Sequence, residues 1–135
     1  MGSLKVISKI GKIQNTDERI FQFLSDFRNF DRLIPPDVEG WESDANSCHF
    51  RLKGQAIELH IVERIPFKTI KIQSDDGSAF PFTFWIQLVS VSAYDTRVRL
   101  TVHADVNMMM KVVLKKQLKK GLDSLVDQLA IIPYP

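Results

Sequence analysis

The chain has 135 residues, the size of one ordinary globular domain, and we expect residues 1–135 to form a single domain. Apolar residues make up 44% of the chain and charged residues 25%, and the formal net charge is only +2. Such a small charge argues against nucleic acid as a partner, because nucleic-acid binding needs a concentrated basic surface. The one cysteine, Cys48, excludes an intramolecular disulfide and a cysteine metal cluster, and we expect no metal or other cofactor.

No stretch approaches the roughly 18 apolar residues that a membrane-spanning helix requires. The first residues also lack the apolar core of a signal peptide. With a lone cysteine that suits a reducing compartment, these features predict a cytoplasmic protein with no integral membrane association.

The chain opens with a predicted strand over residues 4–14, in which Val6, Ser8 and Ile10 alternate with their neighbours. Asn15 and Thr16 then offer a helix N-cap. The helix that follows has one apolar stripe, formed by residues that recur at helical spacing, namely Ile20, Phe23, Leu24 and Phe27. A further turn over residues 30–34 points Phe30, Leu33 and Ile34 inward, and Pro35-Pro36 stops it.

Between residues 38 and 106 the apolar period changes from 3.6 to 2, which predicts about six antiparallel strands with one apolar face. Gly54-Gln55 is the expected turn between the second and third of these strands. The alternating apolar positions on the covered face are Cys48, Phe50, Leu52, Ile57, Leu59, Ile61, Ile70, Ile72, Phe82, Phe84, Ile86, Leu88, Val98, Leu100, Val102 and Ala104.

The closing segment, residues 108–132, predicts one long amphipathic helix that Pro133 ends. Its outward face carries charged residues such as Lys116 and Asp123. The predicted inward face consists of Leu114, Leu118, Gly121, Leu122, Leu125, Leu129 and Ile132. Because a sheet with one apolar face must be covered, and only this helix is long enough, we expect the helix to lie on the sheet.

This order resembles the START-like (helix-grip, SRPBCC, polyketide cyclase-like) superfamily. The resemblance rests on residues 15–26, on Asn29 to Pro35, on residues 95–100 entering the last strand, and on the long helix after Asn107. It implies an α+β fold in which a curved antiparallel sheet of about seven strands wraps around the last helix. The resemblance also implies one or two short helices after the first strand and an apolar cavity between sheet and helix.

The first functional hypothesis is therefore the binding of a small apolar or amphipathic ligand in that cavity. Gly121 is a notable member of the inward face, because a mid-helix glycine houses a ligand, lets the helix bend over the sheet, or receives a bulky phenylalanine. The alternative is that the large side chains simply fill the interior as core. The predicted ligand-binding residues are Phe23, Phe27, Phe50, Leu59, Phe84, Leu100, Leu118, Gly121 and Leu125.

A cyclase- or dehydratase-type enzyme of the same superfamily is the second hypothesis, and it requires an ionisable group inside the cavity. The candidates are Asp26, Arg28, Glu63 and Asp105, each of which base rates favour as an exposed residue. We find no nucleophile motif and no convincing active site. His49, His60 and His103 lie on the polar face by strand parity, without carboxylates at metal-ligand intervals, so a zinc site is not expected.

The third hypothesis concerns the start of the last helix, where Met109, Val112 and Val113 stand beside a group of lysines. Apolar residues there predict a contact surface at the cavity mouth, for a homodimer, or for a peripheral membrane contact, against the alternative of a solvated face. The lysines are Lys111, Lys115, Lys116, Lys119 and Lys120.

Overall fold

The computed structural model describes residues 2–75 and 81–135. Within these ranges, the strands are β1 (Gly2–Ile7), β2 (Gly11–Ile13), β3 (Val38–Ser43), β4 (Ser47–Leu52), β5 (Gln55–Ile65), β6 (Thr69–Ser74), β7 (Phe82–Ser92) and β8 (Asp95–Val106). The helices are α1 (Asp17–Leu24), the 3-10 helix η1 (Phe27–Leu33) and α2 (Met108–Ala130).

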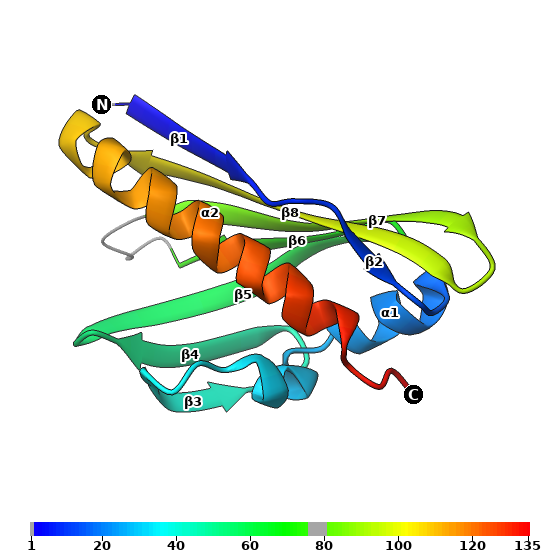
Figure 1. Cartoon of the computed structure of the whole chain (residues 1–135). Helices are drawn as coiled ribbons and strands as arrows, with labels where there is room; N and C mark the ends of the chain where they lie inside the picture. The colour runs from blue at the N-terminus through cyan, green and yellow to red at the C-terminus, as the bar shows by residue number, and fades with distance from the viewer. Residues whose placement is uncertain (1, 76–80) are drawn as a thin grey trace.

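All strands belong to one antiparallel sheet in the order β1-β8-β7-β6-β5-β4-β3, with β2 also paired to β8. The sheet curves, and α2 runs obliquely across one of its faces (Figure 1). The predicted α+β helix-grip architecture is thus confirmed. The turn between β4 and β5 is Lys53-Gly54, one residue earlier than predicted, and both residues have positive φ (51° and 79°), as a tight hairpin turn requires.

The predicted first strand is divided into β1 and β2. Ile7 pairs with Thr101 and Gly11 with Val98, so four steps along the first segment match three along β8. The extra residue changes the alternation, which leaves Ile10 66% exposed while Ile13 is buried. Ser8 stabilises the segment between β1 and β2, because its backbone N–H donates to Leu100 O and its Oγ accepts from Leu100 N, both at 2.8 Å.

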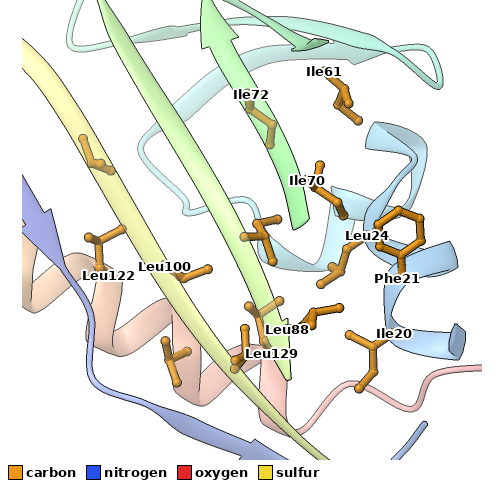
Figure 2. Packing of buried hydrophobic residues seen from close by; sticks show 14 of the residues in the cluster. Ile20, Phe21, Leu24, Ile61, Ile70, Ile72, Leu88, Leu100, Leu122 and Leu129 are labelled. Atoms are coloured by element: carbon orange, nitrogen blue, oxygen red, sulfur yellow. The ribbon is translucent and has the colours of Figure 1, made fainter. Parts of the chain in front are cut away.

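α1 begins where the capping pattern predicts. Thr16 Oγ1 accepts a hydrogen bond from Arg19 N at 3.2 Å. Ile20, Phe21 and Leu24 are its buried residues and point into the main core, near Ile70 and Leu88 (Figure 2). Phe21, rather than the predicted Phe23, therefore occupies the interior side of this helix.

α2 starts after the N-cap Asn107, whose Oδ1 accepts from Met110 N at 2.8 Å. Its buried residues are Leu122, Val126 and Leu129, and it packs against β1, β2 and β8. The inward face is thus rotated toward Val126, which the predicted face did not include. Gly11 explains this rotation, because a methyl group at that position would overlap Val126 Cγ1. A bare glycine on β2 lets α2 approach closely at this point.

Candidate functional site

An apolar pocket of about 220 Å³ lies where η1, the β3–β7 part of the sheet and α2 meet. η1 and the segment after it supply one wall, the sheet supplies the floor, and α2 contributes Leu125. The complete lining is Phe27, Phe30, Leu33, Ile34, Pro35, Val38, Trp41, Phe50, Leu59, Ile72, Phe82, Phe84 and Leu125. No charged side chain stands among these residues.

Aromatic rings dominate the pocket. Phe27 and Phe30 of η1 meet edge to face, with ring centroids 5.1 Å apart. On the sheet, Trp41 of β3 lies over Phe50 of β4 with centroids 5.7 Å apart and planes 32° from parallel. These pairs hold flat, rigid faces around the hollow, an arrangement suited to a planar apolar molecule.

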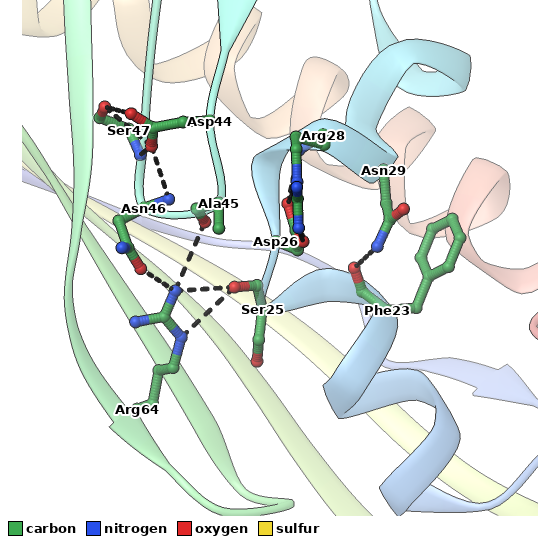
Figure 3. A network of polar contacts seen from close by, with 10 residues as sticks. All are labelled: Phe23, Ser25, Asp26, Arg28, Asn29, Asp44, Ala45, Asn46, Ser47 and Arg64. Carbon is green, nitrogen blue, oxygen red and sulfur yellow. Dashed lines mark hydrogen bonds and ion pairs between the residues drawn. The ribbon is translucent and has the colours of Figure 1, made fainter.

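A polar network fixes η1 against the sheet (Figure 3). Nη2 of Arg64, on β5, donates to Ser25 O at 2.8 Å and to Asn46 Oδ1 at 2.7 Å. The Phe27 backbone N–H also donates to Ala45 O at 3.3 Å. These bonds tie the end of α1 and the start of η1 to the β3–β4 turn and to β5, and so position Phe27.

Two aspartates stabilise the loops of this network. Asp26 accepts from Arg28 N at 2.9 Å and from the Arg28 guanidinium, and this hydrogen bonding lowers the pKa of its carboxyl. Asp44 accepts from the backbone N–H groups of Asn46 and Ser47, both at 2.8 Å, which likewise lowers the pKa of Asp44.

Five predicted ligand-binding residues line this pocket, namely Phe27, Phe50, Leu59, Phe84 and Leu125. The other four lie elsewhere. Phe23 meets the Tyr134 ring edge to face at 5.2 Å, Leu100 is fully buried in the core, and Leu118 is half-buried against the core.

Gly121, the fourth, is exposed and has no atom within 4 Å of where a Cβ would stand. No phenylalanine therefore packs against it. The close approach that a glycine makes possible occurs at Gly11 instead, and nothing in the helix contacts requires a glycine at position 121.

Trp41 is the main residue of the pocket that sequence reasoning missed. Val38 and Trp41 both line the pocket although they are three residues apart, which strict alternation would place on opposite faces. A bulge between Glu39 and Glu42 accounts for this, and Gly40 adopts φ +66° within it. The Glu-Gly-Trp sequence was the available signal, since a glycine inside a strand often marks a bulge.

The indole Nε1 of Trp41 is buried and has no hydrogen-bond partner in the described part of the chain. An indole N–H removed from water normally finds an acceptor. Ser25 Oγ is the other buried polar side-chain atom without a described partner. Of the two residues, only Trp41 lines the pocket.

The sequence shows no carboxylates at metal-ligand intervals around the histidines, but the fold brings carboxylates beside His49 and His60. His49 Nε2 lies 3.1 Å from Glu42 Oε2, and ligand atoms of Glu58, His60 and Asp75 all lie within 4.8 Å of one another. His49 meets Glu42 across the β3–β4 pair, and Asp75, which follows β6, joins Glu58 and His60 of β5. The contacts between strands do not show as intervals along the chain. Two carboxylates and one imidazole are ligands that a divalent cation accepts, although both Glu58 and Asp75 are exposed.

The candidate acid–base residues lie outside the pocket. Asp26 is paired with Arg28, and Glu63 and Asp105 are exposed. Cys48 is buried, and desolvation raises the pKa of its thiol to about 12, so the thiolate needed of a nucleophile is disfavoured.

No family model and no curated protein matches the chain. Solved structures do. A START superfamily protein from Mycobacterium smegmatis matches with a TM-score of 0.65 and 18% identity, over 95% of this chain and 99% of its own. Norcoclaurine synthase from Thalictrum flavum matches with a TM-score of 0.73 and 10% identity, over 96% of this chain and 84% of its own. The Aha1 dimer structure from Colwellia psychrerythraea matches with a TM-score of 0.60 and 23% identity, over 97% of this chain and 98% of its own.

The fold is START-like. This confirms the resemblance that the element order indicated. Proteins with a START-like fold have different functions, so the fold does not determine the ligand, which has to be inferred from the residues of the pocket. Among the described residues, no helix is long and apolar enough to cross a membrane.

Proposed function

We propose that the chain is a single START-like domain that binds a small, uncharged, planar apolar molecule in the pocket between η1, the sheet and Leu125. The observation that carries this proposal is a pocket wall made of apolar side chains from three separate elements, five of them phenylalanines and one a tryptophan. Convergent apolar walls of this kind are typical of small-molecule sites.

The size of the pocket favours a ligand of one or two rings over a two-chain lipid, since 220 Å³ lies below the usual range of drug-sized sites, about 300–1,000 Å³. Burying about 200 Å² of apolar ligand surface contributes about 5 kcal/mol. That corresponds to a dissociation constant on the order of 0.1 to 1 mM. The complex of the similar norcoclaurine synthase with dopamine and hydroxybenzaldehyde, both single-ring molecules, agrees with this size.

The same lining favours binding over catalysis. General acid–base chemistry needs a titratable group within reach of the substrate, and the described lining residues offer none. The one polar atom that we assign to recognition is Trp41 Nε1, which can donate to a ligand hydroxyl or carbonyl oxygen after a small movement of the ring. We also propose a cytoplasmic location, in keeping with a lone, buried thiol.

The test is a titration of the ¹⁵N-labelled protein with naphthalene and with 2-naphthol, followed by amide and indole N–H shifts. Leu59→Trp fills the pocket and is expected to abolish binding. Val62→Trp is the matched control, because Val62 lies on the same strand with 49% of its surface exposed. Shifts spread evenly over the protein surface, or equal binding by the two variants, would contradict the proposal.

A second candidate function is a contact surface at the start of α2, for a peripheral membrane contact or a second copy of the chain. The observation that favours it is the exposure of Met108, Met109 and Val112, between 71% and 81%. Large apolar side chains this exposed and this close together are uncommon on a solvated face.

A further inference from the structure

The first half of α2 carries an apolar and basic surface, which we call the α2 patch. Its apolar part is Met108, Met109, Val112 and Val113, with exposures of 71%, 81%, 77% and 54%. Its basic part is Lys115, Lys116, Lys119 and Lys120, which follow within the next two turns.

Helical spacing places both parts on one side. Met109, Val113, Lys116 and Lys120 recur at intervals of three and four residues, so one plane can meet the apolar turn and the lysines together. The patch continues onto the sheet, because Lys5 and Ile7 of β1 line a shallow hollow with Val112, Lys115 and Lys116. Ile7 is itself 39% exposed.

The patch carries positive charge only. Residues 108–122 hold five lysines and no acidic residue. Asp123 is the first acid of α2, and it pairs with Lys119 at 3.2 Å. Among the residues that the structure describes, Lys116 and Lys120 have no ion-pair partner. This concentration of charge stands out in a chain whose net charge is only +2.

We propose that the α2 patch docks on the surface of an anionic lipid bilayer, an inference that rests on the second candidate function above. Exposed methionines and valines enter the boundary between headgroups and acyl chains, while the lysines beside them meet the lipid phosphates. A second copy of the same patch is a poorer occupant, because two such surfaces would set lysines against lysines.

The experiment is flotation of the full chain with vesicles of phosphatidylcholine alone, or with about one third phosphatidylglycerol. We expect binding only to the anionic vesicles, and release at high salt because screening weakens attraction to the surface. Lys116→Gln with Lys120→Gln is expected to lower the partition coefficient roughly thirtyfold, since each lysine at an anionic surface contributes roughly fivefold.

Charge-matched and hydrophobicity-matched variants serve as controls. Arg19→Gln with Lys68→Gln removes two charges near α1, at the other end of the molecule from the start of α2 (Figure 1), and is expected to leave binding unchanged. Met109→Ser with Val113→Ser is expected to abolish binding. Val89→Ser with Val91→Ser, at valines of β7 that are 63% and 59% exposed, is expected to preserve it. Thermal unfolding of every variant confirms that the fold is retained.

Two outcomes would overturn the lipid proposal. Equal binding to both kinds of vesicle, or to neither, refutes an anionic bilayer as the occupant. If sedimentation then shows a dimer that Met109→Ser with Val113→Ser dissociates, the contact surface stands and its partner is a second copy. If neither vesicles nor self-association respond to these substitutions, the contact function fails as well.

Discussion

Gly11→Ala is the sharpest test of how α2 is seated on the sheet. The new methyl group would overlap Val126 Cγ1 and lie 3.3 Å from Val98 Cγ1. Overpacking of a well-packed contact costs about 1–3 kcal/mol. The φ of Gly11 is not in the left-handed region, so alanine also restricts the unfolded chain and returns about 0.4–1 kcal/mol. We expect a net loss of about 1–2 kcal/mol in the free energy of unfolding.

A second substitution identifies the cause of that loss. Val126→Ala removes the overlapping Cγ1 and, because Val126 is 1% exposed, is expected to cost about 2 kcal/mol by itself. In the double variant, the methyl group introduced at position 11 occupies the space that the valine vacates. The loss in the double variant should therefore fall short of the sum of the single losses by about 1–2 kcal/mol. Urea unfolding followed by circular dichroism measures each value, with unchanged m-values confirming comparable states.

Gly121→Ala is the matched control. Since no atom lies within 4 Å of the new methyl group, only helix propensity changes, and stability should rise by up to about 1 kcal/mol. A neutral Gly11→Ala, strictly additive losses in the double variant, or a destabilised Gly121→Ala would refute this account of the helix position.

Three further predictions follow from the contacts around the pocket. Arg64→Met should lower the free energy of unfolding by about 1–2 kcal/mol in urea titrations, because Ser25 O and Asn46 Oδ1 lose their charged donor. Arg64→Lys should recover only part of this stability, because an ammonium group lacks the forked geometry of a guanidinium. Hydrogen bonds lower the pKa of Asp44, so the stabilisation that its carboxylate provides is present above the ordinary aspartate pKa near 3.8 and is lost as pH falls through the lowered pKa. Asp44→Asn should therefore flatten the fall in melting temperature between about pH 5 and 2. An unchanged pH dependence would contradict this role of Asp44. Finally, Cys48 should react with a thiol reagent at pH 8 only as fast as the chain opens, since burial raises its pKa to about 12, and rapid labelling without denaturant would contradict this.

The architecture could be predicted because it depends on local chemistry that repeats along the chain. Thr16 caps α1 as its sequence context indicates, and α2 begins directly after Asn107, where the helical period starts. The alternation through Phe50 and Leu59 fixes which face of β4 and β5 is covered. Each of these features depends on residues that are close in sequence, so it can be predicted from one sequence alone.

Three features escaped prediction because each depends on a partner distant in sequence. The bulges beside Ser8 and at Gly40 shift alternation by one residue, and pairing with β8 or β4 fixes where each bulge falls; in the sequence, Gly40 alone signals the second one. The rotation of α2 toward Val126 depends on the absence of a side chain at Gly11, more than a hundred residues away. The bulge at Gly40 turns Trp41 into the pocket, and the rotation of α2 leaves Gly121 exposed.

The seating of α2 also sets the shape of the pocket, which yields one more prediction. Val126 packs at Gly11, while its neighbour Leu125 forms the helix side of the pocket. The overlap in Gly11→Ala is relieved when α2 moves away from β2, and such a movement carries Leu125 with it and alters the pocket. We therefore expect Gly11→Ala to weaken the binding of 2-naphthol several-fold, Gly11→Ala with Val126→Ala to restore much of it, and Gly121→Ala to leave it unchanged. Unaltered affinity in a destabilised Gly11→Ala would show that the sheet, not the helix, yields at this contact, and would separate the stability of the fold from the geometry of its pocket.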